Sequence, residues 1–287
     1  MKPPPFDYYC PDTLEEALAL LAEHGEEAKV IAGGQSLVPM LNLRALHPGV
    51  LIDINRLPGL DHISLEDGQL RVGALARHKA VLESAAVQEA SPLMALAYPY
   101  VSHGPIRNRG TLCGNLCHND PASEMPAVAL ASDAEMVLQS ASGTRTVAAE
   151  DFFTGTLSTA AEANEMLVEV RVPRAPAGQG AGFHEVSPRK GDFAYVAVGA
   201  TLEIADGACS AARIVCAGVG DGPHRARAAE DALTGAAPGD DAFRQAAAAA
   251  ADSIDPNEDF HADADYRRDL VRSLTRRALA DAASRCN

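Results

Sequence analysis

Residues 29–44 read KVIAGGQSLVPMLNLR, and the N-terminal part of the chain is organised around this stretch. Residues 30–32 are apolar and predict a short strand that ends at Gly33 and Gly34. Two glycines at a strand end allow a sharp turn, because no Cβ obstructs the backbone or a group bound to it. Residues 37–44 then place apolar side chains at helical spacing. The stretch therefore predicts a strand, a glycine turn and a helix.

Such a turn has the properties of an anion site. Successive backbone N–H groups can point at one spot, the Ser36 hydroxyl adds a donor, and the turn opens into a helix N-terminus, which suits a phosphate or pyrophosphate. For a single Gly-Gly pair, an ordinary strand–turn–helix corner is the simpler explanation. A second glycine-rich stretch, residues 104–133, predicts further tight turns at Gly110–Thr111 and Gly114–Asn115. Two such stretches suit a long dinucleotide that needs support at several points.

Composition excludes several classes of function. The chain has 287 residues, 47% hydrophobic and 22% charged, as in an ordinary soluble globular protein. Its net charge of −15 argues against binding to nucleic acid or to an anionic membrane surface. The N-terminus, MKPPPFDYY, lacks the apolar core of a signal peptide, and no apolar run is long enough to span a bilayer. Six scattered cysteines indicate reduced thiols and a cytoplasmic protein.

The first fifty or so residues predict a small, mostly parallel sheet. Thr13 and Glu16 form a capping box for a helix with an apolar stripe, and Gly25 is expected to end that helix. The expected elements are strands at 6–9, 30–32 and 50–53, and helices at 14–21 and 37–44.

From about residue 60 the pattern becomes antiparallel. Strands are expected at 62–65, 70–72, 134–139, 145–147 and 165–172, with helices near 79–86 and 92–98 and one capped by Ser123. Strands at 195–204 and 211–217 and helices at 226–233, 243–253 and 266–282 follow. We predict an α+β protein of three domains, 1–58, 59–176 and 177–287, with residues 175–182 (APAGQGAG) connecting the last two.

Three motifs together resemble a known family. AGGQS at 32–36, TLCGN at 111–115 and DPASE at 120–124 resemble the FAD-binding subunit of the molybdenum hydroxylases. That family includes carbon monoxide dehydrogenase, xanthine dehydrogenase and bacterial N-heterocycle dehydrogenases. The resemblance covers nearly the whole chain, including RKGDFA at 189–194. It implies a PCMH-type FAD-binding fold, with a small α/β subdomain, a larger α+β subdomain, and a C-terminal β-meander with helices.

The resemblance also implies which residues bind FAD. The pyrophosphate and ribityl would lie on the two glycine stretches, here Ala32, Gly33, Gly34, Gln35, Ser36 and Leu37, and Thr111, Leu112, Cys113, Gly114 and Asn115. Asp120 and Glu124 would reach the sugar or adenine end, and Leu167 and Lys190 would lie near the flavin ring. The chain departs from the family where Cys113 replaces a usual glycine and Phe193 a frequent tyrosine. We expect the Cys113 thiol either to restrict the backbone or to lie beside the flavin.

The implied activity is electron transfer. Substrate would be hydroxylated at a molybdenum cofactor in a large partner subunit, and electrons would pass through the [2Fe-2S] clusters of a small partner subunit to FAD and then to an external acceptor. A dimer of such heterotrimers is expected. The sequence offers no Ser-His-Asp or Cys-His arrangement for a separate active site, so no catalytic residue is assigned.

The sequence allows alternative interpretations. A self-sufficient flavin oxidase or reductase of the same superfamily would need a substrate domain with its own acid or base, which the C-terminal third does not suggest. A scaffold that has lost its cofactor would not need both glycine stretches. Cys113, Cys117 and His118 lack the remaining ligands of a metal site. Residues 255–265 (DPNEDFHADAD) lack the central Gly and terminal Glu of a calcium loop, and we interpret them as an acidic connection that could face a partner.

Overall fold

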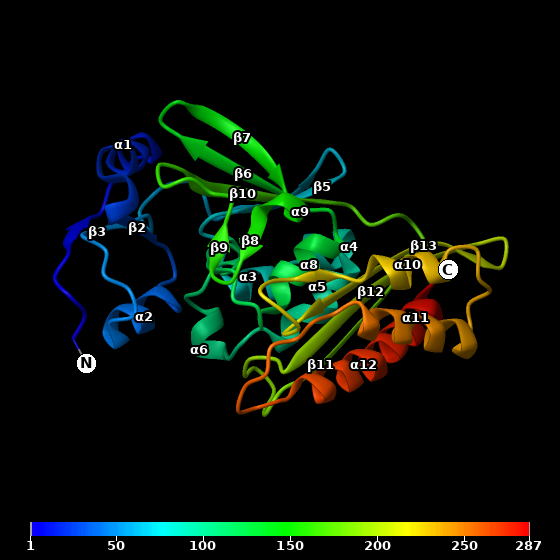
Figure 1. The fold of residues 1–287 in the computed structure, drawn as a ribbon. Coiled ribbons are helices and arrows are strands. Elements are labelled where there is room, and N and C mark those ends of the chain that lie inside the picture. The colour runs from blue at the N-terminus through cyan, green and yellow to red at the C-terminus, as the bar shows by residue number, and fades with distance from the viewer. Residues whose placement is uncertain (1, 287) are drawn as a thin grey trace.

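The first sheet is small and parallel, as predicted. A computed structural model describes residues 2–286. The strands lie in the order β1-β3-β2, and both pairs are parallel. The elements are β1 (Asp7–Tyr9), α1 (Leu14–His24), a 3₁₀ turn (Gly25–Glu27), β2 (Ala28–Ile31), α2 (Leu37–Leu43) and β3 (Val50–Asp53). This unit forms one end of the molecule (Figure 1).

Helix α1 connects this unit to the rest of the chain. Its capping box is present, because the Thr13 hydroxyl accepts from the backbone of Glu16 and the Glu16 side chain bonds back to the cap. The apolar stripe is buried and contacts the strand β6 (Glu135–Ser140) of the second sheet. The first sheet is therefore packed against the second unit through a helix that the sequence pattern predicted.

The second sheet is antiparallel and has the strand order β4-β5-β10-β6-β7. Its other strands are β4 (Ile63–Glu66), β5 (Gln69–Gly73), β7 (Gly143–Ala148) and β10 (Met166–Pro173). Asp67 and Gly68, with φ of 51° and 74°, make the predicted tight turn between β4 and β5. A short helix, α9 (Ala149–Phe152), leads into a small hairpin of β8 (Phe153–Gly155) and β9 (Ser158–Thr159).

Helices fill the space beside this sheet. They are α3 (His78–Glu83), α4 (Ala85–Ala90), α5 (Pro92–Ala97), a 3₁₀ turn (Tyr98–Tyr100), α6 (Gly104–Arg107), α7 (Leu112–His118) and α8 (Glu124–Ala131). The helix expected near 79–86 is in fact two helices, because the Ser84 hydroxyl caps a new one at the Val87 N–H. The tight turn expected at Gly114–Asn115 is wrong, since both residues lie inside α7.

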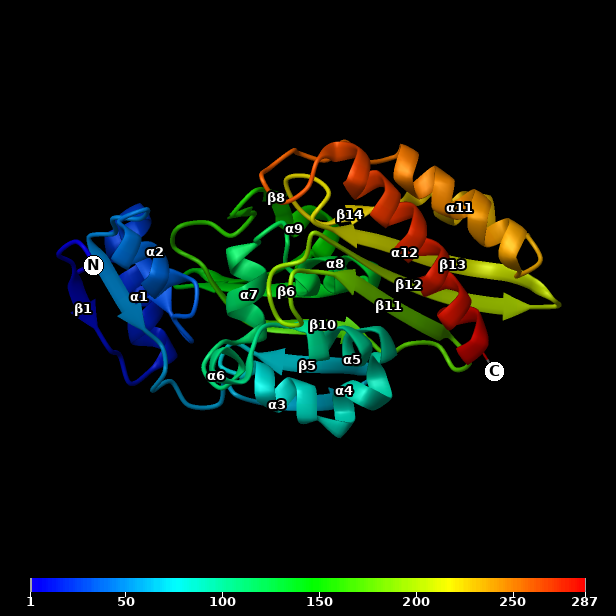
Figure 2. The same ribbon diagram turned by 90° about the horizontal axis from the view of Figure 1, so that it is seen from below.

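The third sheet lies beside the helices and has the order β11-β12-β13-β14. Its strands are β11 (Gly180–Val186), β12 (Val196–Ala205), β13 (Ala208–Ala217) and β14 (His224–Arg225), followed by α10 (Arg227–Leu233), α11 (Asp240–Asp252) and α12 (Ala264–Arg285). Helices α11 and α12 cover one face of this sheet (Figure 2). The predicted connection at 175–182 is shorter than expected, because β11 begins at Gly180.

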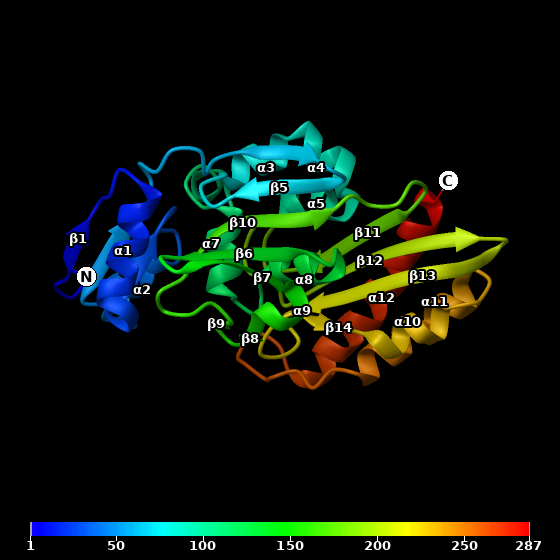
Figure 3. The same cartoon turned by 90° about the horizontal axis from the view of Figure 1, so that it is seen from above.

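Two hydrophobic cores meet at the third sheet. Val196 and Val198 of β12 belong to the core under α11 and α12, whereas Ala197 between them belongs to the larger core of the second unit. Helices α5 and α8 contact the strands on that second face. The layers follow one another in Figure 1, and Figure 3 looks down on the second sheet, which lies in front of the helices. Because side chains alternate along the strands, one face of the third sheet packs in the core with α5 and α8 and the other in the core with α11 and α12.

The α+β fold class is confirmed. None of the helices described within residues 2–286 combines the length and apolar character needed to cross a membrane.

Candidate cofactor-binding cleft

The first glycine turn leaves its polar groups available to a ligand. Gly34 has a φ of 68°, in the left-handed region that favours glycine. The Gln35 amide bonds back to the Gly33 carbonyl oxygen at 3.0 Å, which fixes the turn. Ser36 is the N-cap of α2, but its hydroxyl makes no capping bond. The turn thus presents backbone donors and one uncommitted hydroxyl.

A hollow of about 440 Å³ opens beside this turn. It is lined by residues 31–35 and by Val38 and Pro39 from the turn and α2, by Asp53 and Asn55 from the end of β3, and by Arg109. Arg109 belongs to the second glycine-rich stretch and brings a cation to the first. A glycine turn with an arginine opposite it has the donor set and charge that a pyrophosphate needs.

The two glycine stretches touch through their backbones. A Cβ atom on Gly33 would lie 2.6 Å from the Cα atom of Gly110 and 2.8 Å from the carbonyl carbon of Arg109. Since real Cβ atoms do not approach other atoms so closely, only glycine fits at position 33. The predicted proximity of the two stretches therefore has a direct structural basis.

Arg77 and Asn55 hold this junction together. The Arg77 guanidinium donates to the Arg109 carbonyl oxygen at 2.5 Å and to Asn55 Oδ1 at 2.6 Å. Asn55 Nδ2 in turn donates to the Ala32 carbonyl oxygen at 2.7 Å. One side-chain pair thus connects the backbone of the first glycine turn to the backbone that precedes the second.

Asp53 lines the hollow as an ionised carboxylate. Burial acts to raise the pKa of its carboxyl, but hydrogen bonds from Tyr8 and Asn55 and the charge of Arg109 outweigh burial and lower that pKa. The Tyr8 hydroxyl donates to Asp53 Oδ2 at 2.6 Å. The carboxylate therefore stays charged near neutral pH and helps to balance the Arg109 cation.

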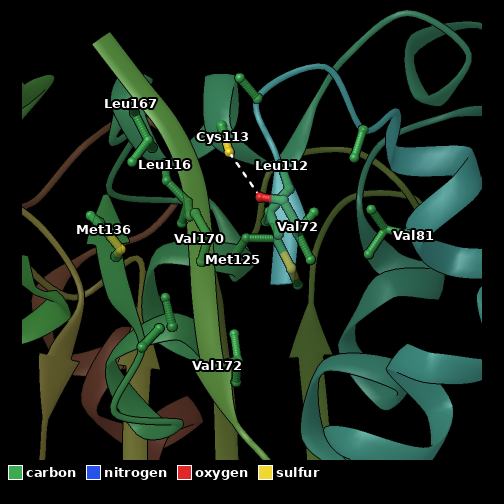
Figure 4. Packing of buried hydrophobic residues seen from close by; sticks show 14 of the residues in the cluster. Val72, Val81, Leu112, Cys113, Leu116, Met125, Met136, Leu167, Val170 and Val172 are labelled. Carbon is green, nitrogen blue, oxygen red and sulfur yellow. Dashed lines mark hydrogen bonds between the residues drawn. The ribbon is translucent and has the colours of Figure 1, made fainter. Parts of the chain in front are cut away.

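The second glycine-rich stretch contains the start of helix α7. Thr111 is the N-cap of α7, and its hydroxyl accepts from the Gly114 N–H at 3.1 Å. The side chains of Leu112, Cys113 and Leu116 are buried, while Gly114 is exposed on the opposite side of the helix. The Cys113 thiol points into the core toward the Val72 carbonyl oxygen, 3.7 Å away (Figure 4). Of the two outcomes considered for Cys113, a thiol beside the cofactor is therefore not what the structure shows.

Asn115 connects α7 to the DPASE segment. Its amide donates to the Ser123 hydroxyl at 2.9 Å, and that hydroxyl donates back to Asn115 Oδ1 at 3.0 Å. Ser123 occupies the N-cap position of α8 as expected, but its hydroxyl makes no capping bond there. Asp120 Oδ1 accepts instead from the Ala122 N–H at 2.9 Å and forms the preceding turn.

The remaining predicted residues lie apart from the first turn. Glu124 begins α8 and is buried, and Leu167 on β10 is buried in the core. Lys190 extends over the Tyr100 ring, with its Nζ atom 5.4 Å from the ring centroid. Four polar residues of the cleft and its junction were missed by the sequence analysis: Asp53, Asn55, Arg77 and Arg109. Only Arg109 left a local signal, as a basic residue beside Gly110.

Comparison with known proteins identifies the family. Residues 4–175 match the family described as FAD binding domain in molybdopterin dehydrogenase, and residues 181–282 match the CO dehydrogenase flavoprotein C-terminal domain. The chain is 41% identical to the 6-hydroxypseudooxynicotine dehydrogenase complex subunit alpha of Paenarthrobacter nicotinovorans, over 99% of this chain and 97% of the relative. It is 40% identical to the caffeine dehydrogenase subunit beta of Pseudomonas sp. (strain CBB1), with the same coverage.

The chain belongs to the FAD-binding subunits of the molybdenum hydroxylases. A chain of the carbon monoxide dehydrogenase from Hydrogenophaga pseudoflava superposes with a TM-score of 0.97 at 40% identity over 100% of both chains. One of quinoline 2-oxidoreductase from Pseudomonas putida 86 gives 0.94 at 37% identity over 99% of both. The predicted family, fold and FAD cofactor are confirmed.

Membership of this family decides between the two enzyme classes considered. The relatives are subunits of multi-subunit dehydrogenases, so the comparisons support an electron-transfer subunit of an oxidoreductase over a self-sufficient flavin oxidase or reductase. The residues of the cleft fit FAD, because the glycine turn, the uncommitted Ser36 hydroxyl and the Arg109 cation match a pyrophosphate.

Proposed function

We propose that this chain holds FAD across its two glycine stretches and passes electrons from the iron–sulfur clusters of a partner subunit to an external acceptor. The observation that carries the proposal is the contact of the Gly33 turn with Arg109 and Gly110 beside an open hollow. When bound, FAD supplies the redox chemistry, since it exchanges electrons singly or in pairs. The chain itself binds and orients it.

The binding roles follow from the neighbours of each group. Residues 32–37 and Arg109 would hold the pyrophosphate, and the accessible side of α7, with Gly114 and Asn115, would support the ribityl chain. The buried Thr111 would contribute by capping the helix at the Gly114 N–H. Leu112 and Cys113 contribute their backbone only, because their side chains are buried in the core. Asp120 keeps its proposed role at the sugar or adenine end.

Glu124 keeps its proposed role at the sugar or adenine end. Its neighbour Ser123 is bonded to Asn115 in the second glycine stretch. Leu167 would lie behind the ring as part of the core.

We further propose a complex of this chain with an iron–sulfur small subunit and a molybdenum-binding large subunit, as a cytoplasmic dimer of heterotrimers. The names of the relatives, among them a dehydrogenase complex subunit and a carbon monoxide dehydrogenase medium chain, support a heteromeric assembly. We retain domain limits of 1–58, 59–176 and 177–287, with the cofactor between the first two.

The test is to isolate the native complex through a tag on this chain and to release its cofactors by denaturation. We expect one FAD per chain, an iron–sulfur absorbance shoulder before denaturation, molybdenum by elemental analysis, and two co-purifying subunits. A flavin-containing chain without partners or iron would overturn the subunit proposal. A colourless complex would overturn FAD binding itself.

A further inference from the structure

A buried histidine lies against the second glycine-rich stretch. His78 is the first residue of α3 and is 4% exposed. A Cβ atom on Gly110 would lie 2.8 Å from Cδ2 and 3.3 Å from Nε2 of its imidazole, so the ring is packed against the glycine backbone. Helix α3 lies next to α6, the short helix that precedes this glycine (Figure 2). The imidazole does not line the hollow beside the first glycine turn, so contact with a ligand in that hollow does not explain it.

The backbone of the same segment is also joined to the second stretch. The His78 N–H donates to the Gly110 carbonyl oxygen at 2.9 Å. Beside this bond, Arg77 and Thr111 form an antiparallel bridge. The start of α3 and the start of α7 are therefore held to each other at one point, and a shift of the first segment would shift the second.

A second buried side chain fixes the imidazole. Tyr98 is fully buried, and its hydroxyl oxygen lies 3.3 Å from His78 Nδ1. Within residues 2–286 this hydroxyl has no other hydrogen-bond partner, and a buried phenol needs an acceptor for its O–H. Burial first, and the Arg107 cation second, lower the pKa of the His78 imidazole to about 4, so the ring is neutral near pH 7. The Tyr98 O–H therefore donates to Nδ1, and the ring proton lies on Nε2.

Gly110 is thus in contact with two different parts of the chain. The first glycine turn reaches it on one side, because a Cβ atom on Gly33 would lie 2.6 Å from its Cα atom. The His78 ring reaches it on another side. Since Gly110 has no side chain, the ring determines how closely α3 and the first turn can approach each other. The neighbouring Arg109 lines the hollow, so the same ring also determines where this cation lies.

We propose that His78, held by Tyr98, is a positioning residue for FAD, because its ring keeps Gly110 against Gly33 and thereby places Arg109 at the pyrophosphate. This inference rests on the proposed FAD site and deepens it. The histidine acts through the glycine backbone and does not itself touch the cofactor. Its contact with Gly110 is the feature that affects FAD, whereas the hydrogen bond to Tyr98 only orients the ring.

Two substitutions separate the contact from the hydrogen bond. His78→Asn keeps a polar group near the place of Nδ1 but removes the ring edge that meets Gly110. We expect it to lower the FAD affinity of the native complex by roughly tenfold or more, because a small misplacement of a binding group is costly. His78→Phe combined with Tyr98→Phe keeps the ring and removes both polar partners, so FAD affinity should stay within about threefold of the wild type. The affinity is measured by rebinding FAD to the complex after its release, with flavin fluorescence as the signal.

A double-mutant cycle with Arg109 distinguishes positioning from a general loss of structure. Under the proposed function, Arg109→Met weakens FAD binding by itself. In that background, His78→Asn should weaken it by less than about threefold more, because the group that it misplaces is already absent. His224→Ala is the matched control, since it removes a half-buried imidazole that is bonded to Ser253 in the third domain. It should lower the unfolding free energy and leave FAD affinity unchanged.

The outcomes separate this inference from the proposed function. Wild-type FAD affinity in His78→Asn, or an equal loss with and without Arg109, overturns the positioning role and leaves the FAD site standing. If His78→Asn does not assemble, the double phenylalanine variant decides, and loss of FAD from its assembled complex overturns the positioning role. A wild-type complex that binds no FAD overturns the proposed function and the positioning role together.

Discussion

The Cα atom of Gly110 lies 2.6 Å from the point where a Cβ atom on Gly33 would stand. The contact joins a turn after the first sheet to the loop before α7, although the two residues are far apart in the sequence. Because the obstructing atoms are backbone, a side chain at position 33 cannot be accommodated by a rotamer change. Gly33 is therefore required by the junction itself, whether or not a cofactor is bound.

Gly33→Ala should destabilise the chain in the absence of FAD. Forcing one methyl group against fixed backbone costs about 1–3 kcal/mol, as overpacked cores do. The measurement is urea unfolding of the flavin-stripped protein, compared with Gly220→Ala, whose added Cβ would meet nothing within 4 Å. Equal stability of the two variants would contradict the close approach.

Gly114→Val separates cofactor binding from packing. A Cβ at this exposed position would meet only the Thr111 hydroxyl, at 2.8 Å, so the variant should lose that N-cap bond, about 1 kcal/mol, and otherwise keep its fold. A branched side chain there would occupy the face of α7 that we assign to FAD. We expect FAD occupancy after gel filtration to fall at least tenfold, a loss of about 1.4 kcal/mol or more in binding. Gly220→Val is the control, and full occupancy in both variants would remove Gly114 from the site.

How far the sequence could predict this site depends on whether a feature is local. The parallel sheet, the capping box at Thr13 and the turn at Gly68 were predictable, because each rests on neighbouring residues. Gly114 was wrongly predicted to lie in a turn, because glycine disfavours a helix unless capping or packing stabilises that helix. Here that support is a Thr111 cap and two buried leucines of α7. The Arg77–Asn55 pair left no local trace, because only the folded chain brings it together.

The Arg77–Asn55 pair should couple the two glycine stretches. Arg77→Met leaves the Asn55 and Arg109 oxygens without their charged donor, and a hydrogen bond to a charged group contributes about 1.5–3 kcal/mol. A double-mutant cycle with Asn55→Ala on FAD affinity should give a coupling of about 0.5–3 kcal/mol. Arg244→Met, at an exposed ion pair on α11, is the control for loss of charge. Strictly additive effects would show that the pair does not connect the stretches.

Arg267 should be the most sensitive arginine of the third domain. Its guanidinium is buried and donates to the carbonyl oxygens of Tyr195 at 2.5 Å and Gly218 at 2.8 Å, and it pairs with Asp259. The Gly218 N–H donates in turn to the Pro121 carbonyl oxygen in the DPASE segment.

Arg267→Met should therefore cost about 1.5–3 kcal/mol in unfolding free energy and weaken FAD retention, because two carbonyl oxygens and the half-exposed Asp259 carboxylate lose their charged donor. The neighbouring Arg268 pairs only with exposed acids, so Arg268→Met should change stability by less than about 1 kcal/mol. Thermal and chemical unfolding of the two variants measure the difference. A similar loss of unfolding free energy in both variants would mean that the burial of Arg267 does not increase its contribution to stability.

The inaccessible carboxyl of Glu185 also predicts the sign of a pH effect on stability. Burial raises the folded-state pKa of Glu185 above its ordinary value of about 4.5. Between these two pKa values the folded state binds more protons than the unfolded state, so this group's contribution to stability falls as pH rises through the window. Glu185→Gln removes the titration and keeps the shape. The variant should gain stability relative to the wild type on going from pH 5 to pH 9, as followed by melting temperature in each buffer, whereas Glu66→Gln, at the exposed end of β4, should track the wild type. A gain that is the same at both pH values would mean that the Glu185 carboxyl does not titrate in this range.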